Sequence, residues 1–234
     1  MDVLPLKIDS LMILQSHPKK VVEKYAKKGM RISGRAFDQT RTFELHKHVE
    51  ILKNYTLTKC GNSVVLVWVR LELSDRRLDA DKGYFIPQVK LPRIQNKPHF
   101  ERLENAFTFI EMLEDHIEKW NVIDLKDLKI NDSHCWCLYA DITILNDDGN
   151  IYPVIWKGLA SCLEQTRIPE LEDLNVIGTG DLLKVNPIEI TKVVNIGEFT
   201  LSDPDKREED NCDSYTICSE RNGKPLWISG AMAL

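Results

Sequence analysis

The sequence lacks a long apolar run, which excludes a conventional membrane-spanning helix. Its longest apolar stretch, residues 64–69, is far shorter than the roughly 20 residues that cross a bilayer. No signal peptide is expected either, because Lys7 and Asp9 interrupt the mildly apolar residues 1–14. We therefore expect a soluble intracellular protein, with no membrane partner.

Cysteine pairs with the spacing of a zinc site are also missing. Of the six cysteines, Cys135 and Cys137 flank Trp136, so they would point the same way from one strand, a poor geometry for a disulfide. The other four are scattered along the chain. Reduced, mostly buried thiols are the expected state, as in most intracellular proteins.

Positive charge is not in excess. The formal net charge is −5, whereas a protein that binds nucleic acid alone is more often basic, because phosphate contacts supply its affinity. If RNA is a ligand, this chain is expected to provide only part of the binding surface.

The common catalytic motifs are absent: phosphate-binding glycine loops, HExxH and GxSxG. His46 and His48 share one face of a predicted strand, but without a nearby third ligand they indicate a solvent-facing pair. Acidic neighbours occur at 147–148, at 203 with 205, and at 208–210. We interpret them as turns or solvated loops, because acid–base and two-metal chemistry need carboxylates that converge from different elements. No metal and no cofactor is predicted.

Two helices are predicted in the first half of the chain. Residues 17–29 form a short basic helix, with Ser16 as its cap and Gly29 at its end. Its lysines are typical of a solvated face, with RNA contact as the alternative. Residues 99–121 form an amphipathic helix that should lie against a sheet. Its apolar positions recur every three or four residues: Phe100, Leu103, Phe107, Ile110, Leu113, Ile117 and Trp120.

Strand signals surround these helices and indicate an α+β domain, with antiparallel or mixed sheets and helices packed between and against them. Residues 166–186 are expected to be a connection and residues 205–213 a charged loop. A helix is predicted over 153–165. The predicted strands are 43–49, 55–59 and 63–73 as an antiparallel meander, then 84–91, 135–145, 188–194, 198–201, 215–218 and 226–228.

Five segments, in order along the chain, together resemble RNase PH domains. The likeness is strongest to non-catalytic ring subunits of the eukaryotic RNA exosome, the group related to the inactive ring partner of archaea. The segments are RISGRAFDQTR at 31–41, TKCGNSVV at 58–65, DKGYFIPQV at 81–89, LYADI at 138–142 leading to DGN at 148–150, and LSDP at 201–204 followed by Glu208 and Glu209.

The resemblance implies an RNase PH-like fold and a domain plan. Residues 1–29 would be an N-terminal extension carrying the basic helix, and residues 30–234 the RNase PH-like domain. That domain would divide into subdomains at about 30–170 and about 171–234. Members of the family continue into a long C-terminal helix, whereas this sequence reaches Ser229-Gly230-Ala231 and stops at Leu234. Either the helix is absent or the sequence is short at this end.

The resemblance also implies that catalysis has been lost. Active members bind the attacking phosphate with a Gly-Thr-Arg turn, and the matching turn here is Gly149-Asn150-Ile151. Isoleucine offers neither charge nor donor to a reaction that depends on electrostatic stabilisation. Active members place aspartates near this turn, and Asp203 and Asp213 fall in that neighbourhood without a clean match.

As an exosome ring subunit, the chain would pack with other RNase PH-like chains in a six-membered ring beneath S1/KH-type cap subunits. It would help to guide single-stranded RNA through the pore, with Arg76 and Arg77 as candidate backbone contacts. The expected locations are the nucleus, including the nucleolus, and the cytoplasm. Two alternatives stay open: an active phosphate-dependent 3′–5′ exoribonuclease, and an unrelated α+β protein-interaction domain.

Overall fold

The computed structural model describes residues 17–75, 81–91 and 99–232. Its internal contacts divide the chain into two compact units. Unit 1 comprises Met1–Arg41, Asp148–Asn150 and Ile190–Leu234, and unit 2 comprises Thr42–Asp147 and Ile151–Glu189. The chain therefore passes between the units more than once, and the boundary expected near residue 170 lies inside unit 2.

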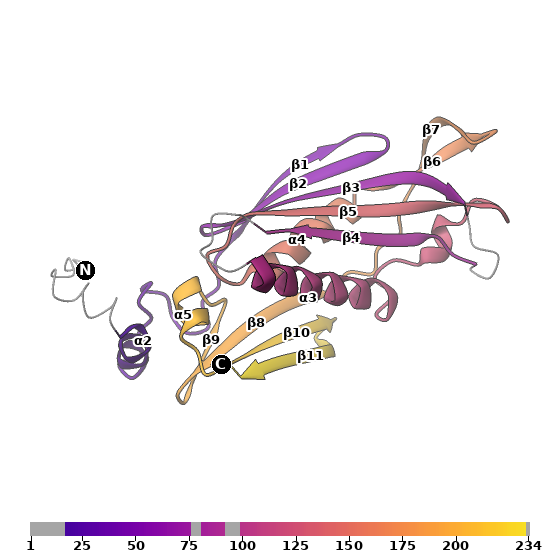
Figure 1. Cartoon of the computed structure of the whole chain (residues 1–234). Helices are drawn as coiled ribbons and strands as arrows, with labels where there is room; N and C mark the ends of the chain where they lie inside the picture. Colours follow the sequence, from indigo (N-terminus) through magenta and orange to yellow (C-terminus); the bar gives the residue numbers. More distant parts are fainter. Residues whose placement is uncertain (1–16, 76–80, 92–98, 233–234) are drawn as a thin grey trace. The chain divides into compact units, whose positions relative to one another are not determined.

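A five-stranded sheet of order β1-β2-β3-β5-β4 forms the framework of unit 2 (Figure 1). Strands β1 to β3 form the predicted antiparallel meander, and β5 pairs antiparallel with β3. The outer strand β4 pairs parallel with β5, because the long α3 connection lies between these two strands in the chain. The strands are β1 (Phe43–Val49), β2 (Lys53–Cys60), β3 (Ser63–Asp75), β4 (Tyr84–Lys90) and β5 (His134–Asn146).

Two helices, α3 (His99–Glu118) and α4 (Ile151–Leu163), pack against this sheet (Figure 1). The alternating burial along β2 and β3 gives the sheet an apolar face, on which the nearly wholly buried α4 lies. Helix α3 agrees with its predicted range, but Phe107 is 61% exposed, so its place in the buried stripe was wrong. Leu113 and Ile117 are buried as predicted, and among the α3 side chains that the structure describes His116 is buried with them.

The expected connection over 166–186 contains a two-stranded hairpin, β6 (Arg167–Glu172) and β7 (Asn175–Leu182). The prediction of a plain connection was wrong because the hairpin has little apolar alternation: most of its side chains are exposed, and Gly178 and Gly180 interrupt β7. At Gly180 a side chain would collide with the carbonyl oxygen of Ile168. The short η1 (Leu125–Leu128) completes unit 2.

The described part of unit 1 contains a four-stranded sheet of order β11-β10-β8-β9 and the helices α2 and α5. An apolar cluster of Val22, Val194, Ile196, Leu201 and Cys212 joins the first helix to this sheet. The elements are α2 (Pro18–Ala26), β8 (Glu189–Ile196), β9 (Phe199–Ser202), α5 (Lys206–Asp210), β10 (Ser214–Arg221) and β11 (Lys224–Met232).

Three predictions about unit 1 and its helices are refined. Helix α2 starts after His17, whose side chain makes no cap hydrogen bond, and the proposed cap Ser16 lies outside the described residues. Gly29, at φ +72°, follows the helix end as expected. The charged loop 205–213 contains α5, which begins with a capping box between Asp205 and Glu208. That reciprocal pairing explains why a run of charged residues folds as a helix.

Several smaller expectations concern surface and thiol chemistry. His46 and His48 are exposed, as predicted. All six cysteines are free thiols, and all except Cys218 are buried. Within the described ranges, no three His, Cys, Asp or Glu side chains form a group that could hold a metal ion. No helix among those residues is long and apolar enough to cross a membrane.

Candidate functional site

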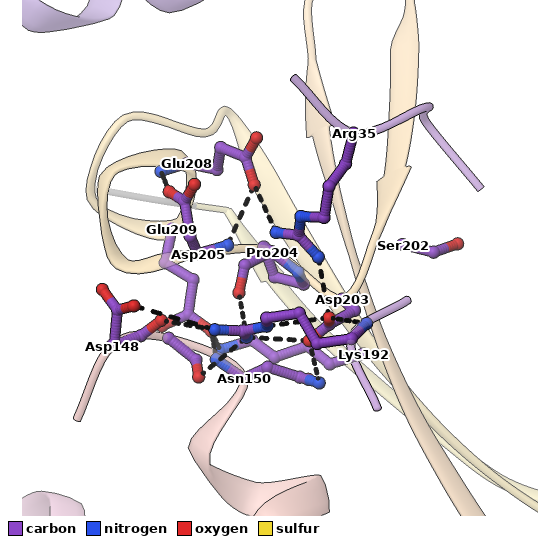
Figure 2. A network of polar contacts seen from close by, with 12 residues as sticks. Arg35, Asp148, Asn150, Lys192, Ser202, Asp203, Pro204, Asp205, Glu208 and Glu209 are labelled. Carbon is purple, nitrogen blue, oxygen red and sulfur yellow. Dashed lines mark hydrogen bonds and ion pairs between the residues drawn. The ribbon is translucent and has the colours of Figure 1, made fainter. Parts of the chain in front are cut away.

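A dense group of charged and polar side chains connects four parts of unit 1: residues 31–41, the turn 148–150, strand β8 and residues 202–209 (Figure 2). We call this group the arginine–carboxylate network. Figure 2 shows Arg35 reaching both Asp203 and Glu208, which belong to the segment after β9. The members of the network are Arg31, Arg35, Arg41, Asp148, Asn150, Lys192, Asp203, Glu208 and Glu209.

Asp203 is the centre of the network. It follows β9 in a left-handed conformation (φ +47°) and is only 4% exposed. Arg41 donates to its carboxylate from the backbone N (2.7 Å), Nε (2.9 Å) and Nη2 (2.8 Å). Arg35 Nη1 (2.8 Å) and Asn150 Nδ2 (2.6 Å) also donate to it. The carboxylate is thus enclosed by donors of the chain itself, which compensate for its removal from water.

Glu208 forms a second buried ion pair, with Arg31. Arg31 Nε donates to Glu208 Oε1 at 2.8 Å, and Arg31 Nη2 bonds the other carboxylate oxygen. The guanidinium also donates to the carbonyl oxygens of Ser202 (2.8 Å) and Asp203 (2.9 Å). Neither side chain of the pair is more than 2% exposed. Such a pair is stable only when its remaining hydrogen-bonding groups are satisfied, as they are here.

A third carboxylate of the network, that of Glu209, bonds to the turn before α4. Gly149 has φ +80°, and a side chain there would lie 2.6 Å from the backbone N of Lys206, so the close approach requires glycine. Asn150, also left-handed at φ +56°, donates its backbone N–H to Glu209 Oε1 at 2.6 Å. Lys192 Nζ donates to the same oxygen at 2.6 Å. A carboxylate of the protein therefore already occupies the backbone N–H of Asn150.

The acidic residues were predicted to be solvated, and for Asp203 and Glu208 that prediction was wrong. Both are buried because their cationic partners lie on residues 31–41, about 160 to 180 positions away. No local pattern announces such a pairing. The signal in the sequence was that Arg31, Arg35 and Arg41 lie within eleven residues, in the segment 31–41 that contributes to the family resemblance. No role had been predicted for these three arginines in the fold.

Of the other residues singled out from the sequence, Asp213 pairs outside the network, Ile151 follows a network member, and Arg76 and Arg77 are not described. Asp213 accepts from Lys19 (2.7 Å) and from the backbone N–H of Gly197 (2.7 Å), and both bonds lower the pKa of its carboxyl. Ile151 is buried and is the first residue of α4, directly after Asn150. Arg76 and Arg77 lie outside the described residues.

No family model matches the sequence, but relatives of known identity do. It is 31% identical over 194 residues to exosome complex component Rrp42 of Methanopyrus kandleri, covering 77% of this chain and 72% of the relative. With the Rrp42 of Methanosarcina acetivorans it shares 30% over 207 residues, covering 84% and 76%. The chain belongs to the Rrp42 family of exosome components.

Solved structures agree with this Rrp42-family assignment at the level of the fold. An archaeal exosome core superimposes with a TM-score of 0.80 at 22% identity, over 95% of this chain and 87% of the other. An Archaeoglobus fulgidus exosome with RNA bound to the active site gives 0.76 at 23% identity, over 95% and 89%. Rice Rrp46 gives 0.61 at 13% identity, over 87% and 86%. The expected RNase PH-like α+β fold is confirmed.

Proposed function

We propose that this Rrp42-family chain is a non-catalytic subunit of an exosome core ring. In that role it scaffolds 3′–5′ RNA processing and degradation and helps to guide single-stranded RNA through the pore. Its partners are other RNase PH-like subunits in a six-membered ring and S1/KH-type cap subunits, and its locations are the nucleus and the cytoplasm. The relatives named as exosome components and the fold shared with an archaeal exosome core support the ring assignment.

The non-catalytic assignment rests on the turn before α4, where the backbone N–H of Asn150 is already bonded to Glu209. Backbone N–H groups just before a helix, together with a nearby cation, form a favourable site for phosphate. Here Glu209 takes both the N–H of Asn150 and the ammonium of Lys192, and it is only 11% exposed. Ile151, which follows Asn150 in the chain, supplies no charge. A phosphate ion would have to displace a carboxylate that is covalently tethered at the site.

Asp203 supports the same conclusion from the other side of the network. A carboxylate that serves as a proton acceptor or a metal ligand needs lone pairs directed at the reacting group. The two oxygens of Asp203 accept five hydrogen bonds from Arg35, Arg41 and Asn150. Its role is therefore to hold segments together.

The direct test mixes the purified full-length chain with single-stranded RNA and inorganic phosphate and measures nucleoside diphosphates. We expect no release above a blank without protein. Release that depends on phosphate and is proportional to the concentration of this chain alone would overturn the proposal in favour of an active exoribonuclease.

A second test asks whether Glu209 closes the phosphate position. Thermal unfolding with and without phosphate is compared for the natural chain and for Ile151→Arg combined with Glu209→Gln. A ligand that binds only the folded state stabilises it, by about 2.7 kcal/mol when present at 100 times its Kd. We expect phosphate to stabilise the double variant more than the natural chain. Ile151→Arg with Asp210→Asn is the matched control, since Asp210 is a half-exposed acid on the same helix.

A further inference from the structure

Helix α2 and the turn that follows it carry four lysines, Lys20, Lys24, Lys27 and Lys28, which we call the lysine row. Lys20 and Lys24 lie about one turn apart on the helix, and Lys27 and Lys28 follow directly after its last residue, Ala26. All four are exposed. The helix is fixed to unit 1 through buried Val22 and Ala26. The row is thus held on a folded surface.

Ion pairing alone does not distinguish the lysine row, because other exposed lysines, such as Lys47, Lys126 and Lys157, also have no carboxylate within 4.0 Å among the described residues. Its distinction is that four such lysines are close neighbours in the chain. Among the described residues, no carboxylate lies within 4.0 Å of any of its four ammonium groups, although Glu23 and Glu198 line the shallow hollow beside Lys27. By contrast, Lys19 on the same helix pairs with Asp213 at 2.7 Å. Four lysines of unit 2 also form ion pairs: Lys53 with Glu50 (3.1 Å), Lys59 with Glu44 (3.8 Å), Lys82 with Glu118 (3.4 Å) and Lys119 with Asp115 (2.9 Å).

This arrangement is unfavourable for the helix on its own. Lys20 and Lys24 lie four residues apart on the helix and repel each other as like charges. The repulsion disappears when a polyanion lies along the row. In a chain with net charge −5, the row is a local concentration of positive charge that suits such a partner.

We infer that the lysine row is a contact surface for the phosphate backbone of single-stranded RNA. The inference rests on the proposed function only in taking RNA as the polyanion. From Lys20 to the end of α2 at Ala26 the row follows about 9 Å of helix, because six residues rise 1.5 Å each, and Lys27 and Lys28 come directly after it. Ammonium groups act on phosphates as point charges and carry no sequence information, so the contact should not depend on base sequence.

The test measures binding of the full-length chain to a fluorescent oligouridylate by anisotropy, at several salt concentrations between 50 and 200 mM. One variant replaces Lys20, Lys24, Lys27 and Lys28 by alanine. The matched control replaces Lys53, Lys59, Lys82 and Lys119 by alanine, which removes the same charge from lysines that are already paired. Because alanine has the highest helix propensity, α2 should persist in the row variant, and circular dichroism checks this.

We expect weaker binding by the row variant and binding close to that of the natural chain by the control. The slope of log affinity against log salt should become shallower by about 1.4 to 2.8, that is about 0.7 for each of two to four lost phosphate contacts. Equal losses in both variants would assign the effect to net charge and overturn the inference.

Unchanged RNA affinity would also overturn the inference. If unchanged affinity came with loss of a ring partner in native mass spectrometry, the row would be a surface for an acidic protein instead. Row-dependent RNA binding by a chain that never joins RNase PH-like partners would keep this inference and refute the ring assignment. The two claims therefore fail separately.

Discussion

The two units of this chain are stabilised by different kinds of interior. In unit 2, helices α3 and α4 cover the five-stranded sheet with fully buried apolar side chains, such as Leu113, Ile117, Ile155 and Leu159. Unit 1 has a smaller apolar cluster around Val194 and adds the arginine–carboxylate network. Its stability therefore depends on charges as well as on buried apolar area.

The difference matters because the two interiors respond differently to change. Apolar burial is non-directional, and a core can relax partly around a lost or added group. A buried ion pair has no such freedom, since removal of one partner leaves an uncompensated charge out of water. Unit 1 should therefore be the part of the chain that tolerates substitution least at its charged positions.

The largest effect should come from Asp203→Ala. This change leaves Arg35 and Arg41 without their shared buried carboxylate and removes the acceptor of Asn150. We expect the free energy of unfolding to fall by about 3–5 kcal/mol, as when a buried ion pair is broken. Urea denaturation measures the change. Asp210→Ala, which loses only a surface pair with Lys206, should cost less than about 1 kcal/mol, and equal effects would contradict the comparison.

Arg31 and Glu208 should behave as a coupled pair. Arg31→Met leaves buried Glu208 with only the more distant Arg35 (3.8 Å) as a cation, and Glu208→Gln leaves buried Arg31 without a carboxylate. Each change should cost about 3 kcal/mol. The double variant should cost less than the sum of the two, with a coupling energy of about 0.5–3 kcal/mol. A double-mutant cycle by chemical denaturation gives this number. Additive costs would show that the ion pair contributes no interaction of its own.

Gly158→Ala tests the apolar interior of unit 2. The added carbon on α4 would lie 2.6 Å from Thr58 Oγ1 and 2.8 Å from Val67 Cγ2, so the sheet must shift. We expect a loss of about 1–3 kcal/mol from overpacking. Thr58→Ala should recover part of it, because the hydroxyl that obstructs the new carbon is buried and has no hydrogen-bond partner. If Thr58→Ala restores none of the lost stability, the apolar core around Gly158 relaxes as little as the arginine–carboxylate network does.

The smallest predicted effect is a pH dependence that arises in unit 2. His116 is fully buried between Met112 O and Tyr152 Oη (3.2 Å), and burial lowers the pKa of its imidazole below the ordinary value of 6.5. The unfolded chain then binds a proton more readily than the folded one. This contribution to stability is complete above pH 6.5 and is lost as the pH falls towards the lowered pKa.

Urea midpoints at pH 7.5 and pH 5.5 measure this effect. The decrease between the two should be smaller in His116→Gln than in the natural chain, because glutamine does not titrate. An identical decrease in both would place the pH dependence elsewhere in the chain.

The features predictable from the sequence were those written in local patterns. The meander over β1 to β3 and helices α3 and α4 followed from two- and three-to-four-residue periodicity, although Phe107 interrupts the expected stripe. The hairpin β6–β7 escaped detection because its exposed, glycine-containing strands lack that periodicity.

The site could be predicted only in part, for a related reason. The quoted motifs contain the arginines, the Gly149 turn and the acidic segment, but their pairing spans almost the whole sequence. No sequence feature next to Asp203, Glu208 or Glu209 indicates that a distant cation or backbone N–H will bind their carboxylates. The significance of Ile151 came from the resemblance and stays a prediction.

Native mass spectrometry of the affinity-purified full-length chain tests the central claim, membership of an exosome core ring, most directly. We predict a complex in which this chain is held with RNase PH-like subunits in a six-membered ring, and which dissociates into RNase PH-like pairs or single chains on activation. Recovery of the chain alone, or only with proteins unrelated to the RNase PH fold, would contradict the proposal.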